Sequence, residues 1–292
     1  MSILISTPTG NIGNRALQQL LNAGADVSII VRNPEKLSDS ILSRVKVHQG
    51  SLTDTAFVTK AFQGAQAVLW VTPTDVTQPD AAAYYRQLGE TAATAIKQTS
   101  VPYVVNISSA GAQLDHAGPI SGLGQIERLL NDVAENVIHL RPGFFMENFL
   151  ADLESIKTDG VIYSPYSGKV SFPVIATKDI GNVAAELLLR REWSGQSIRG
   201  LHGSADLRFT EVAEILSDSL GKPVRHVEIT PEQAYQAYLS FGVSPSYARA
   251  YVEMAQALTQ PGAVLEKRTP ETTTPTTLRE WSDAVLKPLF IG

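Results

Sequence analysis

The chain has 292 residues, of which 43% are hydrophobic and 18% charged, so it is long and apolar enough to bury a substantial core. Its net charge of −5 argues against a nucleic-acid-binding surface, which needs clustered lysine and arginine. The absence of cysteine excludes disulfides, thiolate metal sites and cysteine nucleophiles. Residues 1–6 lack the features of a secretory signal, and no apolar run is long enough to span a membrane. We therefore expect a soluble, cytoplasmic protein that does not bind membranes.

Residues 1–32 carry the most informative pattern. An apolar strand over residues 1–6 leads into a loop over residues 7–13, and a helical pattern follows until Gly24, before a second strand over residues 27–31. Strand, glycine loop, helix and strand form the mononucleotide-binding unit of a Rossmann fold. The free N–H groups at the start of such a helix bind pyrophosphate. We expect a nucleotide site here, although a tight turn that binds nothing would leave the same pattern.

The glycine loop departs from the GxxGxxG pattern of short-chain dehydrogenases. Thr7 stands at the first glycine position, and Pro8 stiffens the turn. Gly10 would let the backbone approach the phosphates, and Gly13 would let the helix pack closely on the strand. The loop residues assigned to the cofactor site are Thr7, Thr9, Gly10, Asn11 and Ile12.

Arg32 ends the second strand, where NAD-preferring Rossmann units carry an acidic residue that bonds the ribose 2′-hydroxyl. An arginine accommodates a 2′-phosphate instead, and Lys36 adds a second cation four residues later. This pattern favours NADP(H) over NAD(H). The alternative is a solvated arginine at the end of a strand.

The first half of the chain alternates strands and helices. We expect strands over residues 45–48, 67–71, 102–106 and 137–140, and helices over residues 54–62, 81–96 and 120–133. This alternation predicts an α/β fold with a doubly wound parallel sheet, which binds its ligand where the strand order reverses, at the first and fourth strands. We assign residues 1–150 to an NAD(P)-binding Rossmann domain, with its sheet completed by parts of residues 175–205.

The second half is less regular and predicts a smaller α/β lobe over residues 151–292 that binds the substrate and does not fold independently. We expect helices over residues 177–190, over residues 209–220 with Thr210 as the cap, from Pro231, from Pro245 and over residues 278–286. Residues 268–277 are rich in threonine and proline and predict a loop. The tyrosines of the two proline-initiated helices either line the substrate cleft or pack as ordinary amphipathic residues.

Several segments together resemble the NmrA-like atypical short-chain dehydrogenases. They are the glycine loop, Arg32, GSLTD at residues 50–54, VTP at 71–73, NISS at 106–109 and, most specifically, LRPGFFMENF at 140–149. The resemblance covers nearly the whole chain, including TTLREW at residues 276–281. It implies a Rossmann domain, a small C-terminal lobe and a substrate cleft between them. The family contains NADPH-dependent quinone and alkene reductases, and also regulators that bind NADP without known catalysis.

The resemblance extends the expected cofactor site along the sheet edge. Besides Arg32 and Lys36, the added cofactor residues are Ser51, Leu52, Val71, Thr72, Pro73, Asn106, Ile107, Ser108, Pro142, Gly143, Phe144 and Phe145. Pro142 and Gly143 fit a tight turn beneath the nicotinamide. An apolar wall would hold a flat substrate. The expected substrate residues are Phe144, Phe145, Met146 and Asn148.

The acid–base residues of related short-chain enzymes are missing. Those enzymes use a tyrosine and a lysine four residues apart, but residues 119–128 contain neither. Leu123 stands where many NmrA-like enzymes keep a lysine, and Ser51 replaces an acidic residue that family members often aim at the adenine. We consider three other proton donors, each with a simpler structural explanation as a turn or exposed residue. They are Ser108, Ser109 and His116.

Two functions remain open. The first is an NADPH-dependent reductase that transfers hydride to a small planar acceptor such as a quinone, because the cofactor carries the chemistry and the protein supplies orientation. The second is a non-catalytic NADP(H) sensor that regulates a protein partner, which the missing tyrosine and lysine favour. The five histidines are widely spaced, so we expect no metal site. A homodimer is compatible with either function.

Overall fold

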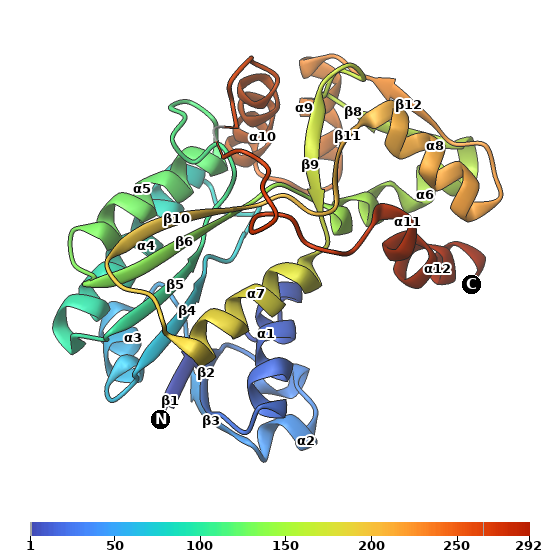
Figure 1. The fold of residues 1–292 in the computed structure, drawn as a ribbon. Coiled ribbons are helices and arrows are strands. Elements are labelled where there is room, and N and C mark those ends of the chain that lie inside the picture. Colours follow the sequence, from blue (N-terminus) through green and yellow to red (C-terminus); the bar gives the residue numbers. More distant parts are fainter. Residues whose placement is uncertain (1, 265) are drawn as a thin grey trace.

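Seven parallel strands form the central sheet in the computed structural model, which describes residues 2–264 and 266–292 (Figure 1). Their order is β10-β6-β5-β4-β1-β2-β3, so the order reverses between β1 and β4, as the sequence predicts. The strands are β1 (Ser2–Ile5), β2 (Asp26–Val31), β3 (Val45–Gln49), β4 (Ala67–Val71), β5 (Tyr103–Ile107), β6 (Asn136–Pro142) and β10 (Gln196–Leu201). The predicted α/β doubly wound fold is therefore confirmed.

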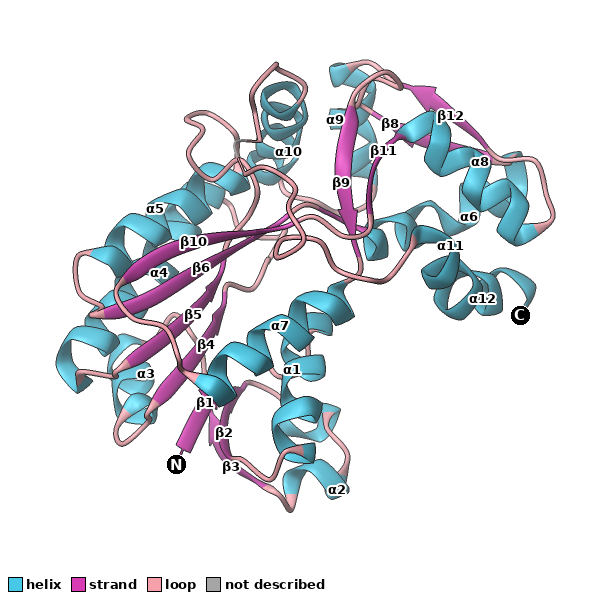
Figure 2. Ribbon diagram, viewed as in Figure 1, coloured by secondary structure: helices cyan, strands magenta, loops and turns pink. Residues whose placement is uncertain are grey.

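Helices cover both faces of this sheet (Figure 2). Leu17 of α1 and Ile180 of α7 belong to the apolar core of one face, whereas Phe62 of α3, Leu88 of α4 and Ile126 of α5 belong to that of the other. Burying two faces explains why the central strands are almost continuously apolar. The helices of this larger lobe are α1 (Asn11–Asn22), α2 (Asp39–Leu42), α3 (Thr55–Phe62), α4 (Ala81–Thr99), α5 (Pro119–Asn131) and α7 (Thr177–Arg190).

The smaller lobe is built around a third apolar core that contains Phe149, Phe209 and Trp281. Its strands form a three-stranded sheet, β11-β9-β7, and a parallel pair, β12-β8. These strands are β7 (Phe144–Phe145), β8 (Val161–Ser164), β9 (Ser171–Ile175), β11 (Ala205–Arg208) and β12 (Arg225–Glu228). The helices are α6 (Leu153–Asp159), α8 (Phe209–Leu220), α9 (Pro231–Ser240), α10 (Pro245–Leu258), α11 (Leu278–Trp281) and α12 (Lys287–Ile291).

The predicted helix cap at Thr210 is wrong. β11 leads directly into α8, whose capping position is Arg208. The backbone N–H of Arg208 donates to the Glu211 carboxylate over 2.8 Å, so a side chain inside the first turn closes the helix start. Thr210 lies within that turn and donates to the carbonyl of Gly168 instead. The other predicted helices of this half are confirmed, and residues 268–277 form the expected loop.

Segments from the end of the chain join the two lobes. Glu266 forms an ion pair with Arg141 at the end of β6 over 2.6 Å. Thr276 donates to the buried carboxylate of Asp179 in α7 through its backbone N–H and its hydroxyl, over 3.0 and 2.9 Å. The lobes are therefore tied together by buried polar contacts as well as by the chain crossings.

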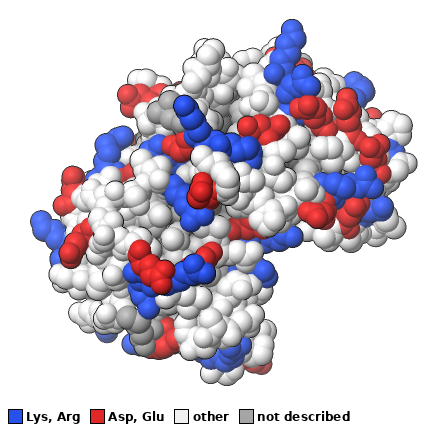
Figure 3. All heavy atoms as spheres, in the orientation of Figure 1, with Lys and Arg blue, Asp and Glu red and all other residues white. Residues whose placement is uncertain are grey.

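Neither the charge distribution on the visible surface nor the helices depart from what the composition indicates. On the face shown in Figure 3, basic and acidic side chains are interspersed over both lobes. Among the described residues, no helix is both long and apolar enough to cross a membrane.

Candidate active site

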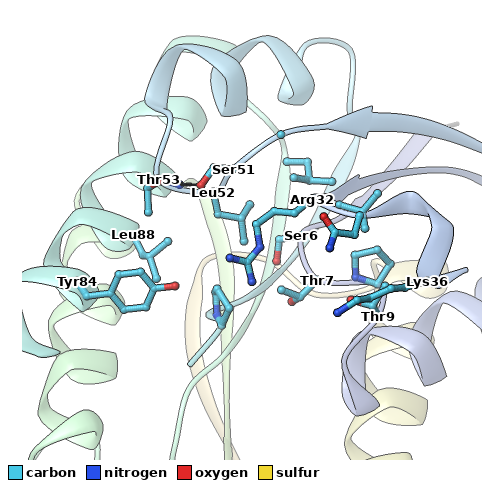
Figure 4. A pocket seen from close by; sticks show the side chains of 16 residues that line it. Ser6, Thr7, Thr9, Arg32, Lys36, Ser51, Leu52, Thr53, Tyr84 and Leu88 are labelled. Carbon is cyan, nitrogen blue, oxygen red and sulfur yellow. Dashed lines mark hydrogen bonds between the residues drawn. The ribbon is translucent and has the colours of Figure 1, made fainter. Parts of the chain in front are cut away.

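The first cavity of interest lies at the carboxyl ends of the parallel strands and has a volume of about 330 Å³. Loops after β1 and β3, the end of β2 and one face of α4 surround it. Figure 4 shows Arg32 in the middle of these side chains, with Tyr84 and Leu88 to one side and Lys36 and Thr9 to the other. The predicted cofactor residues that line it are Thr7, Thr9, Arg32, Lys36, Ser51, Leu52 and Pro73.

The two glycines of the first loop have different structural roles. A Cβ on Gly13 would lie 2.0 Å from the carbonyl oxygen of Thr7, so only glycine lets α1 approach the loop this closely. A Cβ on Gly10 would meet no heavy atom nearer than the carbonyl oxygen of Thr7 at 3.8 Å. The φ of Gly10 is −81°, which any residue can adopt. Neither the fold nor the backbone conformation therefore requires glycine at position 10.

The start of α1 is open to a ligand. No side chain forms a capping hydrogen bond at Gly10, and the first turn contains no acidic residue. The first N–H groups of an α-helix have no partner within the helix, and they carry the positive end of its dipole. This helix of 12 residues therefore presents donors and partial positive charge beside the space above Gly10.

Two cations, Arg32 and Lys36, line the first cavity, and Asp75 lies close enough to Arg32 to feel its charge. Hydrogen bonds from Gln78 and Thr77 hold the pKa of the Asp75 carboxyl below its usual value, and the charge of Arg32 contributes in the same direction. Burial raises the pKa of Tyr84, so its hydroxyl stays protonated. The cavity therefore combines two cations, one nearby anion and a neutral phenol. Sequence reasoning did not identify Tyr84 or Leu88, because both lie on a helix rather than on a loop at the sheet edge.

A second cavity, of about 220 Å³, lies between the sheet edge and the smaller lobe. Its predicted residues are Ser108, Ser109, Pro142, Gly143, Phe144, Phe145 and Asn148. Thr74 and Tyr85 from the larger lobe line it as well, and so do Tyr166 and Phe172 from the smaller lobe, none of which the sequence singled out. Of the tyrosines on α9 and α10, only Tyr251 lines this cavity.

Met146 does not line either cavity, although it was expected in the substrate wall. Its side chain is 1% exposed and belongs to the core of the smaller lobe. Several expected cofactor positions are likewise outside both linings. They are Gly10, Asn11, Ile12, Val71, Thr72, Asn106 and Ile107.

Three buried polar atoms at this sheet edge lack hydrogen-bond partners within the described part of the chain. They are the side-chain oxygens of Thr72 after β4, of Asn106 in β5 and of Ser108 after β5. Buried polar groups in folded proteins are nearly always hydrogen-bonded to protein, water or ligand. These atoms lie on segments next to loops that line the two cavities. Of the three, only Ser108 itself lines a cavity, the second one described above.

The three candidate proton donors do not gather in one place. Ser108 and Ser109 line the second cavity, and the hydroxyl of Ser109 donates to the carbonyl of Ala110 over 3.0 Å. His116 instead lines a separate hollow of about 620 Å³ between α5 and α10, rimmed by exposed side chains such as Arg128 and Arg249. The described residues include no cluster of metal-ligating side chains.

The protein has a Rossmann-type fold: its parallel sheet is doubly wound, α1 begins at the switch point without a side-chain cap, and a second lobe lies over the sheet edge. The model of the NmrA-like family matches residues 1–281, and the chain belongs to that family. The resemblance seen in the sequence is thereby confirmed.

Named relatives agree with this membership. The chain is 32% identical over 254 residues to an NAD(P)H azoreductase of Xenophilus azovorans, covering 86% of this chain and 85% of that protein. It is 25% identical over 249 residues to quinone oxidoreductase 2 of Escherichia coli, covering 84% of each. The solved structure of an NADPH-dependent quinone oxidoreductase from E. coli, complexed with NADPH, superposes with a TM-score of 0.80 at 21% identity, covering 97% of this chain and 99% of that one; this likeness concerns the fold. The expectation that the chain is an oxidoreductase is confirmed.

Proposed function

We propose that this protein transfers hydride from NADPH to a small planar acceptor such as a quinone or an azo compound. The observation that carries the proposal is the pair of cavities at the sheet edge. One is lined by two cations, and the other is mainly apolar with several aromatic side chains. The unpartnered hydroxyl of Ser108 lies in the lining of the second cavity. The names of the azoreductase and quinone oxidoreductase relatives support the same reaction class.

The residues fit a dinucleotide laid across the sheet edge. Arg32 and Lys36 would hold the 2′-phosphate, and the start of α1 with Gly10 would hold the pyrophosphate. Pro142 and Gly143, with the unpartnered hydroxyl of Ser108, would border the nicotinamide. The bound cofactor supplies the hydride. The protein orients the acceptor against the aromatic wall and keeps water away.

The aromatic wall is rigid enough to orient a flat acceptor. The Phe144 ring packs 5.3 Å from the Phe149 ring and 5.5 Å from the Phe209 ring, measured between centroids. Tyr166 and Phe209 are stacked with 11° between their planes. Aromatic rings that are locked against one another present a fixed apolar surface to the second cavity, which suits stacking of a conjugated ring.

The first experiment is NADPH consumption by the purified protein with a panel of quinones and azo dyes, with NADH in parallel. Saturable turnover that prefers NADPH is the expected result. α5 contains neither tyrosine nor lysine, which favours the alternative of a sensor. NADPH binding in calorimetry without turnover of any acceptor would contradict the reductase and support a regulator that acts through a protein partner.

Arg32→Ala should weaken NADPH binding about tenfold to a hundredfold and leave NADH binding nearly unchanged. The reason is that a charge-assisted bond to the 2′-phosphate is lost, and NADH has no such group. Calorimetric titration of both cofactors measures the difference. Lys46→Ala is the matched control, because Lys46 is an exposed cation on β3 outside the cavity. Equal weakening of both cofactors would remove Arg32 from the 2′-phosphate.

A further inference from the structure

The second cavity contains only one type of side chain that titrates in water. Among the described residues that line it there is no histidine, lysine, arginine or carboxylate, and the titratable groups are Tyr85, Tyr166 and Tyr251. Serine and threonine hydroxyls are far weaker acids than a phenol, whose usual pKa is about 10. The tyrosines are therefore the strongest acids among the side chains that line this cavity.

Tyr85 packs against α5 at Gly122, where the helix has no side chain. A Cβ on Gly122 would lie 2.7 Å from the Cγ of Tyr85, so the tyrosine of α4 packs directly over the bare backbone of α5. Gly122 lies within the helix that carries no acid–base tyrosine or lysine, and its neighbour Leu123 lines the cavity. Tyr85 therefore brings a phenol to the α5 side of the cavity, from a different helix.

Tyr85 also lies between the second cavity and the hollow beside α5 and α10. It lines both the second cavity and the 620 Å³ hollow that contains His116. Tyr166 and Tyr251 do not line that hollow. Among the described tyrosines that line the second cavity, Tyr85 alone also borders this hollow.

The surroundings of Tyr85 keep it protonated and well ordered. Its side chain is 4% exposed, and its ring lies 6.3 Å from the Tyr247 ring between centroids. Burial raises the pKa of Tyr85, while the neighbouring hydroxyls of Thr74 and Tyr247 act in the opposite direction. At neutral pH the phenol is therefore neutral and available as an acid.

We propose that Tyr85 is the general acid that protonates the reduced acceptor. This inference rests on the proposed reductase function. Hydride addition to a quinone places two electrons and one proton on it and leaves an anion on one oxygen. The O–H bond of Tyr85 then breaks, its proton forms the second O–H bond of the hydroquinone, and the tyrosinate takes a proton from solvent water, which leaves hydroxide. An azo nitrogen anion is protonated in the same way.

The other tyrosines of the cavity fit this role less well. Tyr166 is stacked on Phe209 and belongs to the core of the smaller lobe, away from the sheet edge. Tyr251 lies on α10, where its ring packs against Tyr238 and Tyr247. Tyr85 belongs to the larger lobe, as do Thr74 and Ser108, which line the same cavity and border the loops proposed for the cofactor.

The test compares two classes of acceptor in Tyr85→Phe, which keeps the ring and removes the hydroxyl. Quinones and azo dyes need a proton after the hydride. A cationic triphenylmethane dye becomes neutral on accepting hydride at its central carbon and needs none. We expect quinone and azo turnover to fall about 100-fold, with triphenylmethane reduction and the NADPH dissociation constant within a factor of about two of the wild type. Tyr103→Phe, on the other face of the sheet beside Trp193, is the matched control.

A binding measurement gives a second readout that does not depend on turnover. In the presence of NADP⁺, 4-nitrophenolate imitates the hydroquinone anion, and its absorbance reports binding. Loss of the Tyr85 hydroxyl should weaken its binding about tenfold, because a hydrogen bond to a charged oxygen is lost.

The outcomes separate this inference from the reductase proposal. If the wild type reduces none of the acceptors, the reductase function fails. If the wild type reduces quinones but Tyr85→Phe is unimpaired, or loses both acceptor classes equally, Tyr85 is not the acid. A selective loss in Ser108→Ala instead would assign the proton to Ser108. Should the wild type reduce quinones but not the cationic dye, unchanged 4-nitrophenolate binding in Tyr85→Phe would overturn the assignment.

Discussion

Gly10→Val should abolish binding of NADPH and NADH alike while the protein remains folded. A Cβ at this position meets no heavy atom nearer than the Thr7 carbonyl oxygen at 3.8 Å, and the backbone at Gly10 is extended, which suits a β-branched residue. It would instead fill the space at the start of α1 where the pyrophosphate is proposed. We expect both dissociation constants to rise at least about 100-fold, with a cost in unfolding free energy near 1 kcal/mol for a poorer capping residue.

Calorimetry with both cofactors and a thermal melt test this pair of expectations. Ala56→Val adds the same side-chain type at an exposed position of α3 and is the control. Gly13→Ala should behave in the opposite way and destabilise the fold, because its Cβ would lie 2.0 Å from the Thr7 carbonyl oxygen. Tight cofactor binding by a folded Gly10→Val protein would refute the phosphate-loop assignment.

Arg141→Ala should lower the free energy of unfolding by about 3–5 kcal/mol, because it leaves buried carboxylates without their cation. The Arg141 guanidinium pairs with Glu127 and Glu266 over 2.6 Å each, and its side chain is 7% exposed. Burial alone would lower the pKa of Arg141, but hydrogen bonds and charge from both carboxylates raise it well above its usual value. The cation therefore cannot be removed without leaving two unpaired anions in the interior.

Denaturant unfolding measures this loss, and a surface ion pair provides the contrast. Arg190 and Glu186 of α7 form an i,i+4 pair over 3.2 Å with side chains 66% and 56% exposed. Arg190→Ala should change stability by no more than about 0.5 kcal/mol. If the two variants were equally stable, the buried network would contribute nothing beyond a surface pair.

The Rossmann lobe could be predicted from sequence because its signals are local. Each signal lies within a few residues of the element that it marks. Examples are the glycine loop, Arg32 and the apolar runs of the central strands. The strands of the smaller lobe are defined only by distant partners. Val161 in β8 pairs with Arg225 in β12, and β7 has just two residues, so neither leaves a periodic pattern to detect.

The candidate site was predictable where it consists of loops after strands. Thr7, Arg32 and Ser108 follow strands, and the fold rule places such residues at the ligand. Tyr84 and Tyr85 were missed because they lie in α4, where an aromatic residue is usually read as packing. His116 shows the converse: its chemistry suggested a donor, but the path of the loop from β5 to α5 places it in the neighbouring hollow.

The contacts of residues 266–277 affect when the nucleotide-binding half can finish folding during translation. Glu266 supplies a carboxylate to Arg141, 125 positions earlier, and the Thr272 carbonyl accepts from the backbone N–H of His202, next to β10. During synthesis on the ribosome, β6 emerges long before β10 is available to pair with its open edge. Arg141 likewise emerges long before Glu266, the second carboxylate that pairs with it. We therefore expect the nascent nucleotide-binding half to stay incomplete, with an unpaired strand edge exposed to aggregation, until most of the polypeptide has been translated.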